Sequence, residues 1–214
     1  MNAEAVYDNL REAIATGRLH PNERLVESDL AEEFGTTRAA VRIALLRLQQ
    51  ERLVEHERNR GARVRPVSED EAVEIYETRA VLEALTAGRA AESATDVDVD
   101  RLRTILARTR RHLDTDEFLA ASESNIEFHG ALVGIAQHAT VERLLATLNP
   151  HLVRYHYRTI LQPDRPEKSF AEHSAIVAAI ERRDARAAER AMWSHLSAAT
   201  ATMREPQPHV TGAP

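Results

Sequence analysis

The chain has 214 residues, of which 43% are hydrophobic, and a formal net charge of −6. This length suits one or two domains with hydrophobic cores. It contains no apolar run of about 18 residues and no basic stretch followed by an apolar one at the N-terminus, so we expect a cytoplasmic protein with no membrane segment. Because cysteine is absent, there is no disulfide or thiolate ligand, and any metal must be held by His, Asp, Glu or amide oxygen.

The charge is unevenly distributed along the chain. Residues 36 to 65 carry eight Arg and three Glu, a local charge of +5, whereas residues 66 to 214 carry 17 basic and 23 acidic groups. A basic segment in an otherwise acidic chain is typical of a nucleic-acid-binding part joined to a part with another partner. We therefore expect two functional parts.

Three helices are predicted in the first 53 residues. Apolar residues recur at helical spacing in AVYDNLREAI, and the Gly and Pro of GRLHPNERL end that helix. The stretch SDLAEEFG predicts a second helix with Ser28 as its N-cap and Gly35 at its end. TTRAAVRIALLRLQQERL predicts a third helix, capped by Thr36 or Thr37. Its buried stripe comprises Val41, Leu45 and Leu48. The last two helices form a helix-turn-helix.

A β-hairpin follows the third helix. In LVEHERNRGARVRPV, apolar and polar residues alternate on either side of RNRG, which predicts two strands with Gly61 at the tip of the turn. Four arginines flank this turn: Arg58, Arg60, Arg63 and Arg65. Since glycine lets the backbone approach a groove closely, the hairpin is suited to act as a DNA-binding wing.

The start of the third helix has the side chains of a DNA-recognition helix. Arg38 and Arg42 are one turn apart on one face, and Thr36 and Thr37 can reach phosphate. The alternative is an Arg-rich solvated domain with no DNA role. The helix-turn-helix, the charge polarity and the hairpin all favour double-stranded DNA as the partner.

These residues resemble a known family. The run LREAIATGRLHPNERLVESDLAEEFGTTRAAVRIALLRLQQERLVEHERNRGARV is similar to the winged-helix domain of the GntR family of bacterial transcription regulators. The resemblance implies that Arg38 and Arg42 are the recognition-helix arginines and that Arg60 and Gly61 form the wing tip. Departures from the usual residues are Asn22 for Gly, Ile43 for Glu, and Ala39 with Ala40 for Thr-Pro. These departures leave the operator sequence open.

From Ser68 onward the sequence is helical in period. Helices are predicted at 69–92, 97–112, 115–137, 139–161, 167–182 and 185–203. We therefore expect a mainly α fold. Its parts are a winged helix-turn-helix domain over residues 1–67, an all-helical bundle over residues 68–204 and a disordered tail over residues 205–214.

A group of one asparagine and three histidines lies in the helical part. NIEFH places Asn125 and His129 one turn apart on one helix face. His173 and His195 are equally spaced from Asp184, the natural N-cap of the last helix, so an antiparallel hairpin turning there brings the two imidazoles level. A single histidine on an apolar face is more simply a core residue, but three together favour a divalent metal.

The helical part also resembles a known domain. Residues 69–203 are similar to the effector domain called FCD of the FadR-like branch of the GntR family, in which Asp, two residues, Phe and His, then two later histidines, hold a metal. The resemblance implies His129, His173 and His195 as ligands, with Zn as the expected metal and Ni as the alternative. Asn125 stands where the family has Asp, and its carbonyl oxygen can coordinate without adding charge.

An open metal face suits a small carboxylate effector whose other end binds a guanidinium. Arg79 lies on the apolar face of the first helix of this part, where the family also has an inward arginine, and is our candidate. Tyr155, with His151 and Arg154 near it, is a further candidate, although these residues also fit a half-exposed polar face.

Together these features predict a DNA-binding transcription regulator, a repressor, whose operator affinity an effector controls. We expect a homodimer on a pseudo-palindromic operator, because one winged helix reads one half-site. The alternatives are a hydrolase or lyase-like enzyme using the three-histidine site, and a structural DNA-binding dimer. Against an enzyme, no glutamate is placed as a general base: Glu172 adjoins His173 but is expected to point away along the helix.

Overall fold

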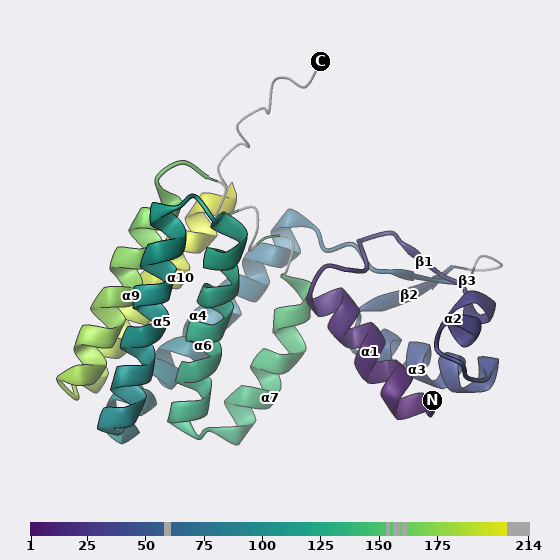
Figure 1. Cartoon of the computed structure of the whole chain (residues 1–214), viewed down its shortest axis with the longest axis horizontal. Coiled ribbons are helices and arrows are strands. Elements are labelled where there is room, and N and C mark those ends of the chain that lie inside the picture. Colours follow the sequence, from purple (N-terminus) through teal and green to yellow (C-terminus); the bar gives the residue numbers. More distant parts are fainter. Residues whose placement is uncertain (58–60, 153–154, 156–158, 160–161, 205–214) are drawn as a thin grey trace, which may run out of the picture. The chain divides into compact units, whose positions relative to one another are not determined.

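The computed structural model describes residues 1–57, 61–152, 155, 159 and 162–204. The chain, drawn in Figure 1, divides into two compact units. Unit 1 comprises Met1–Ser68 and Ala146–Arg154, and unit 2 comprises Glu69–Leu145 and Tyr155–Pro214. The division after Ser68 lies one residue from the boundary expected from the sequence. The segment from Ala146 groups with unit 1, although the sequence had placed it in the helical part.

Unit 1 contains the three predicted helices and a small antiparallel sheet. The helices are α1 (Ala3–Ala15), α2 (Glu27–Glu33) and α3 (Arg38–Gln50). The strands β1 (Arg24–Leu25), β2 (Val54–Glu57) and β3 (Gly61–Val64) pair in the order β1-β3-β2. The predicted helix-turn-helix with a hairpin is therefore confirmed, and β1 adds a strand that the sequence pattern did not indicate.

Two local predictions in unit 1 were wrong. Helix α2 begins at Glu27 with Val26 in the N-cap position. Ser28 therefore lies within the first turn, where its hydroxyl donates to Asp29 at 2.9 Å. Gly61 is the first residue of β3 and pairs with Glu57, so it lies at the base of the turn and not at its tip. Its φ of +83° is a left-handed value that favours glycine. Arg60 lies outside the described residues.

The core of unit 1 fixes the orientation of α3. Thr37 caps this helix, since its Oγ1 accepts a hydrogen bond from the Ala40 amide at 3.2 Å. The predicted stripe of Val41, Leu45 and Leu48 is fully buried against apolar side chains of the other elements of unit 1. Each such burial contributes about 1.5–3 kcal/mol. Because this stripe faces the core, Arg38 and Arg42 face outward.

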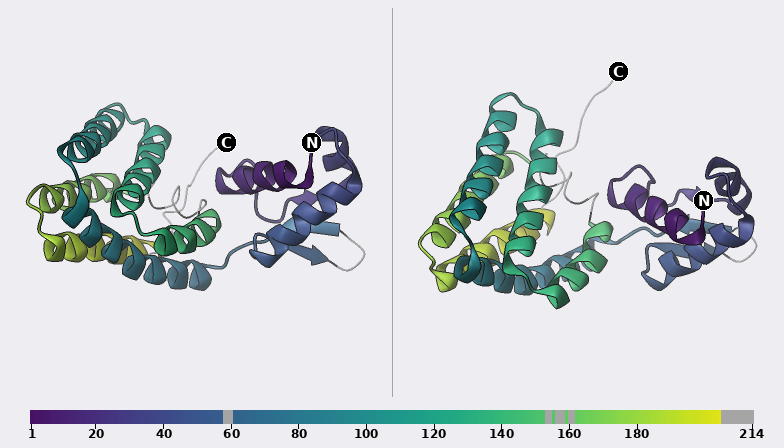
Figure 2. Two further views of the ribbon diagram at one scale, coloured as in Figure 1. Left: turned by 90° about the horizontal axis from the view of Figure 1, so that it is seen from below. Right: turned by 60° about the horizontal axis from the view of Figure 1, so that its bottom comes forward.

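Unit 2 is an all-helical bundle. The helices of this part of the chain are α4 (Glu69–Ser93), α5 (Asp96–Asp114), α6 (Phe118–Ala136), α7 (Ala139–Leu148), α9 (Arg165–Glu181) and α10 (Ala185–Arg204). The last residues of α7 and the 3-10 turn η1 (Asn149–His151) after it group with unit 1. Helices α9 and α10, light green and yellow in Figure 2, lie side by side, and α10 also packs along α4. The largest fully buried side chains include Phe128, Leu102, Ile176 and Met192. The prediction of a mainly helical second part is confirmed.

The predicted helix 139–161 is interrupted. Helix α7 ends at Leu148, and the 3-10 turn that follows carries Pro150. Proline lacks the amide hydrogen that an α-helix needs and its ring clashes with the carbonyl four residues earlier, which accounts for the end of α7. His151 and Tyr155 are therefore not neighbours on one continuous helix.

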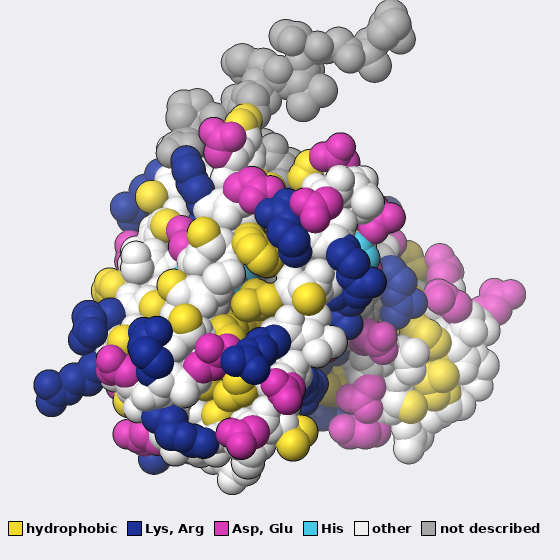
Figure 3. All heavy atoms as spheres, turned by 60° about the vertical axis from the view of Figure 1, so that its left-hand side comes forward, with side chains coloured by type: hydrophobic (Ala, Val, Ile, Leu, Met, Phe, Trp, Pro, Cys, Tyr) yellow, Lys and Arg dark blue, Asp and Glu magenta, His cyan; other side chains and the backbone are white. Residues whose placement is uncertain are grey.

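Charges of both signs are mixed over the visible face in Figure 3, with arginines among acidic side chains. Within unit 2, oppositely charged side chains form ion pairs between helices, such as Arg103 of α5 with Glu181 of α9 at 2.8 Å. Such a surface does not present the concentrated positive charge that a DNA backbone attracts.

None of the helices in the described ranges is long and apolar enough to cross a membrane.

Candidate metal centre and DNA interface

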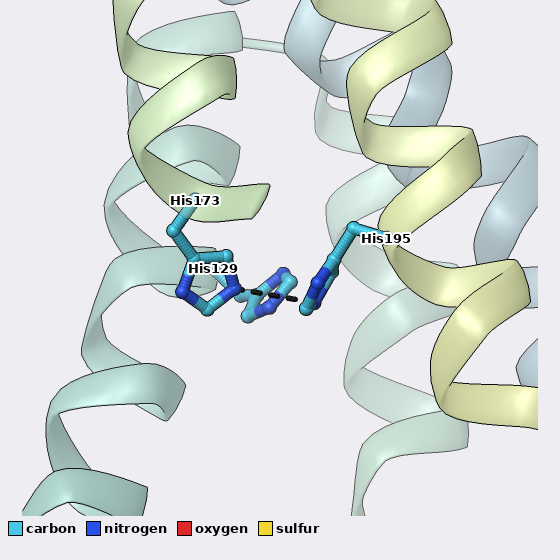
Figure 4. Close-up of side chains that lie close together, drawn as sticks. All are labelled: His129, His173 and His195. Carbon is cyan, nitrogen blue, oxygen red and sulfur yellow. Dashed lines mark hydrogen bonds between the residues drawn. The ribbon is translucent and has the colours of Figure 1, made fainter. Parts of the chain in front are cut away.

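Three histidines from three helices meet inside unit 2. His129 comes from α6, His173 from α9 and His195 from α10, and all three are buried (Figure 4). The Nε2 atoms of His173 and His195 are 3.1 Å apart. One ring nitrogen from each of the three lies within 4.8 Å of the others, a grouping that could hold a metal ion.

The hairpin geometry explains why two of these imidazoles meet. Asp184 lies between α9 and α10, and its Oδ1 accepts a hydrogen bond from the Ala187 amide at 2.9 Å at the start of α10. His173 and His195 are equally far from this turn, so the antiparallel helices bring them level. This expectation from the spacing is confirmed by the 3.1 Å contact.

Two glutamates bind the outer nitrogens of the histidine cluster. The Nδ1 of His129 lies 2.5 Å from Glu83 Oε2, and the Nδ1 of His195 lies 2.7 Å from Glu172 Oε2. The prediction that Glu172 points away was wrong, because its side chain reaches across from α9 to α10. Glu83 was missed, although it lies one helical turn after Arg79 on the same buried face of α4.

These contacts leave the imidazoles of His129 and His195 in a form that can coordinate a metal. Each carboxylate accepts the Nδ1 hydrogen, which fixes the ring and leaves a lone pair on Nε2. Burial, together with neighbouring positive charge, lowers the pKa of His173 and His195 well below the usual value, so both rings are neutral. Neutral imidazole is the form that coordinates metal. The donor set, three nitrogens of which two belong to rings oriented by carboxylates, therefore fits a divalent metal ion.

Two buried arginines complete the charged shell. Arg79 is 3% exposed, and its Nε and Nη2 lie 2.7 and 2.6 Å from Glu83 Oε1. Arg165 is 6% exposed, and its Nη1 lies 2.9 Å from Glu172 Oε2. Burial raises the pKa of Glu83, but Arg79 and His129 outweigh this effect and hold it well below its usual range. Arg79 therefore points inward as predicted, whereas Arg165 was not foreseen.

A cavity lies beside the histidine cluster. Its polar lining includes Arg79, Arg165, Asn125, Thr109, Ser122 and Ser169, and its apolar lining includes Leu113, Phe170 and Leu196. Asn125 thus lies at the same cavity as His129. Tyr155 is buried but is not among the described side chains that line the cavity. His151 lies in unit 1, with its Nδ1 3.4 Å from Arg65 Nη2, and Arg154 is outside the described residues.

The outward face of α3 and the neighbouring strands form a hollow on unit 1. Its charged and titratable lining comprises Arg24, Glu27, Arg38, Arg42 and His56, and Gly61 also lines it. Arg24, Glu27 and His56 were missed because they come from α2 and the sheet and not from the recognition helix. Thr36 donates its hydroxyl hydrogen to the Met1 carbonyl at 2.6 Å, so its hydroxyl is engaged within unit 1.

Comparison with known proteins agrees with the division into a winged helix-turn-helix part and a helical part. The model of bacterial regulatory proteins of the gntR family matches residues 2–64, and the model of the FCD domain matches residues 74–198. The chain is 30% identical to the Uxu operon regulator of Haemophilus influenzae, over 87% of this chain and 76% of that protein. It is 27% identical to the HTH-type transcriptional repressor RspR of Escherichia coli, over 94% of this chain and 89% of that protein.

Solved structures show the same fold. The E. coli protein McbR/YncC matches with a TM-score of 0.80 and 20% identity, over 94% of this chain and 96% of the other. A transcriptional regulator GntR from Rhodococcus sp. RHA1 matches with a TM-score of 0.74 and 26% identity, over the same shares of the two chains. The chain therefore belongs to the GntR family of bacterial regulators, and it is a DNA-binding transcription regulator with an FCD effector domain, not an enzyme.

Proposed function

We propose that the cavity of unit 2 binds a small carboxylate effector beside a divalent metal, and that this binding controls the affinity of the regulator for its operator. The observation that carries the proposal is the convergence of three buried imidazoles, two of them oriented by carboxylates, next to two buried guanidiniums. His129, His173 and His195 are the proposed ligands. Zinc is the proposed metal and nickel the alternative, because both accept imidazole nitrogen.

The charges around the cavity favour an anion. Arg79 and Arg165 are balanced by Glu83 and Glu172, and the histidines at the centre include two that burial keeps neutral. Asn125 adds no charge. A bound divalent ion would therefore leave two positive charges uncompensated in a buried site, which is costly unless an anion accompanies it. One carboxylate compensates one of these charges and a dicarboxylate compensates both, and the hydroxyl groups of Thr109, Ser122 and Ser169 suit a hydroxylated acid.

The proposed action is repression that the effector modulates. The E. coli relative RspR is named a transcriptional repressor, which supports this direction. An effector that binds one conformation of the bundle better than another shifts the population toward it. If the two conformations differ in operator affinity, effector and operator binding are coupled, and each changes the affinity of the other by the same factor.

We also propose a homodimer on a pseudo-palindromic operator in the cytoplasm. One winged helix reads one half-site, so a two-fold operator requires two copies.

Helices α4 and α10 run antiparallel, since Gly88 lies against Glu189 and Glu77 pairs with Arg204. This places Leu85 level with Trp193, and both are exposed, as is Val81 one turn along α4. We call Val81, Leu85 and Trp193 the α4/α10 patch, and we propose that a second copy covers it.

The metal proposal is tested by removing two ligands together. We expect the double variant His173→Ala, His195→Ala to purify with almost no bound metal, whereas the wild type carries roughly one ion per chain because three imidazoles hold it. The measurement is elemental analysis of protein purified without chelator. The matched control is His20→Ala with His112→Ala, which removes two histidines outside the cluster. Equal metal content in the wild type and the ligand variant would contradict the proposal.

The effector proposal needs a second measurement on the metal-loaded protein. A panel of small mono- and dicarboxylates, with and without hydroxyl groups, is screened for a rise in thermal midpoint and then for a change in operator affinity. Replacement of Arg165 by Gln should weaken the affinity for the carboxylate about tenfold or more, as expected for the loss of a buried charged contact. If carboxylates bind but none of them changes the operator affinity, regulation through this cavity is contradicted.

A further inference from the structure

The DNA-facing hollow of unit 1 contains an acidic side chain that the recognition role of the arginines does not explain. Glu27, the first residue of α2, binds Arg42 of α3 through two hydrogen bonds. Arg42 Nε donates to Oε1 at 2.9 Å and Nη2 donates to Oε2 at 2.7 Å. The hollow also contains Arg24, Arg38 and His56. This negatively charged side chain therefore lies among basic side chains on the face that is expected to bind the DNA phosphates.

The geometry of the pair leaves one edge of the guanidinium available. A guanidinium carries five N–H groups in a planar fork. Glu27 uses the edge formed by Nε and Nη2, so the edge formed by Nη1 and Nη2 is not used in this pair. Guanine is read through its O6 and N7 by two such N–H groups. Arg42 can therefore hold Glu27 with one edge and a guanine with the other.

The pair also restrains a long side chain before DNA binds. The Arg42 side chain is 61% exposed, and a free arginine at such a position samples many rotamers. A two-point contact to a carboxylate fixes the guanidinium plane. The Glu27 side chain is only 28% exposed, and the hydrogen bond from Arg42 lowers its pKa, so the carboxylate stays ionised. The anchor is thus less mobile than the side chain it holds.

We propose that Glu27 is a positioning residue for base recognition: it holds Arg42 in the orientation that reads guanine, and its negative charge weakens binding to DNA of other sequence. Glu27 would raise the ratio of specific to non-specific DNA affinity in two ways. It lowers the conformational cost of the specific contact, and it repels phosphates wherever Arg42 has no guanine to bind. The inference rests on DNA binding through α3, and it does not depend on the metal or the effector.

The test compares specific and non-specific binding for four proteins. An operator is first selected from random-sequence duplexes with the wild-type protein, and affinities are measured for it and for a scrambled duplex of equal length. We expect Glu27→Gln to lower the ratio of the two affinities about tenfold, with a two- to threefold gain on the scrambled duplex. Glu27→Asp keeps the charge but is one methylene shorter, so the ratio should fall without that gain. The matched control is Glu33→Gln, which removes an exposed carboxylate from the other end of α2.

A double variant distinguishes positioning from a general effect on the fold. In an Arg42→Ala background, Glu27→Gln should leave the preference for each base of the operator unchanged, because the residue that Glu27 orients is gone. A ratio unchanged in Glu27→Gln, or equally lowered in Glu33→Gln or in the Arg42→Ala background, overturns the proposal. Failure of the wild type to prefer any duplex would instead contradict recognition through α3 itself.

Discussion

At the scale of single residues, the contacts that matter most join side chains from different elements. His195 on α10 meets Glu172 on α9, His129 on α6 meets Glu83 on α4, and Arg42 on α3 meets Glu27 on α2. The sequence offered the histidines and Arg42 as candidates but none of the three carboxylates. A residue one position along a helix points about 100° away, so small differences in helix rotation decide whether a glutamate faces its neighbour.

Arg42 carries a prediction at this scale. Replacing it with Ala removes an exposed side chain that contributes little to the core, so the free energy of unfolding should change by no more than about 0.5 kcal/mol. Affinity for the selected operator should fall by about 1–3 kcal/mol, with little effect on a scrambled duplex. Fluorescence anisotropy at fixed salt measures both affinities. Arg186→Ala, an exposed arginine on α10, is the control, and equal losses for both variants would show that Arg42 does not read bases.

At the scale of elements, local sequence signals located most helix ends. Thr95 caps α5 in a reciprocal arrangement: its Oγ1 accepts from the Asp98 amide at 3.2 Å, and Asp98 Oδ2 accepts from the Thr95 amide at 2.8 Å. Predictions were wrong where a single feature overrode the periodic pattern. Pro150 ended α7 early, and the N-cap of α2 lies two residues before Ser28.

The cap of α5 gives a prediction for stability. Thr95→Ala should lower the free energy of unfolding by about 1 kcal/mol near neutral pH, because an amide at the helix start loses its acceptor. Hydrogen bonds from Thr95 lower the pKa of Asp98, so its contribution is present above the unfolded-state pKa and is lost as the pH falls through the folded-state value. The difference between the variant and the wild type should therefore narrow below about pH 4.

Chemical denaturation at pH 7 and pH 3 measures this effect. Thr104→Ala is the control, because Thr104 lies inside α5, where its hydroxyl donates to the Asp100 carbonyl at 2.8 Å and does not cap the helix. That change should stay within about 0.5 kcal/mol at both pH values. A loss for Thr95→Ala no larger than the control value would contradict the importance of the cap.

At the scale of the whole molecule, the proposed dimer depends on the α4/α10 patch as its interface. Trp193 is 50% exposed, and placing a glutamate there would bury a charge in the proposed interface. We expect Trp193→Glu to be monomeric at concentrations where the wild type is dimeric, and to bind a two-half-site operator at least tenfold more weakly. Light scattering after gel filtration gives the mass. Val97→Glu, on a more exposed residue of α5, is the control. A dimeric Trp193→Glu would exclude the patch as the interface.

The two kinds of domain, the buried and outward faces of α3, and the approach of His173 to His195 could all be predicted from the sequence. These follow from local rules: caps, apolar periodicity and equal spacing from a hairpin turn at Asp184. The folded chain was needed to show which carboxylates hold the histidines and Arg42, that Arg165 lines the cavity, and that residues from Ala146 group with unit 1. The physical reason is that side-chain contacts between elements depend on how helices rotate and pack against each other, which periodicity along one helix does not specify.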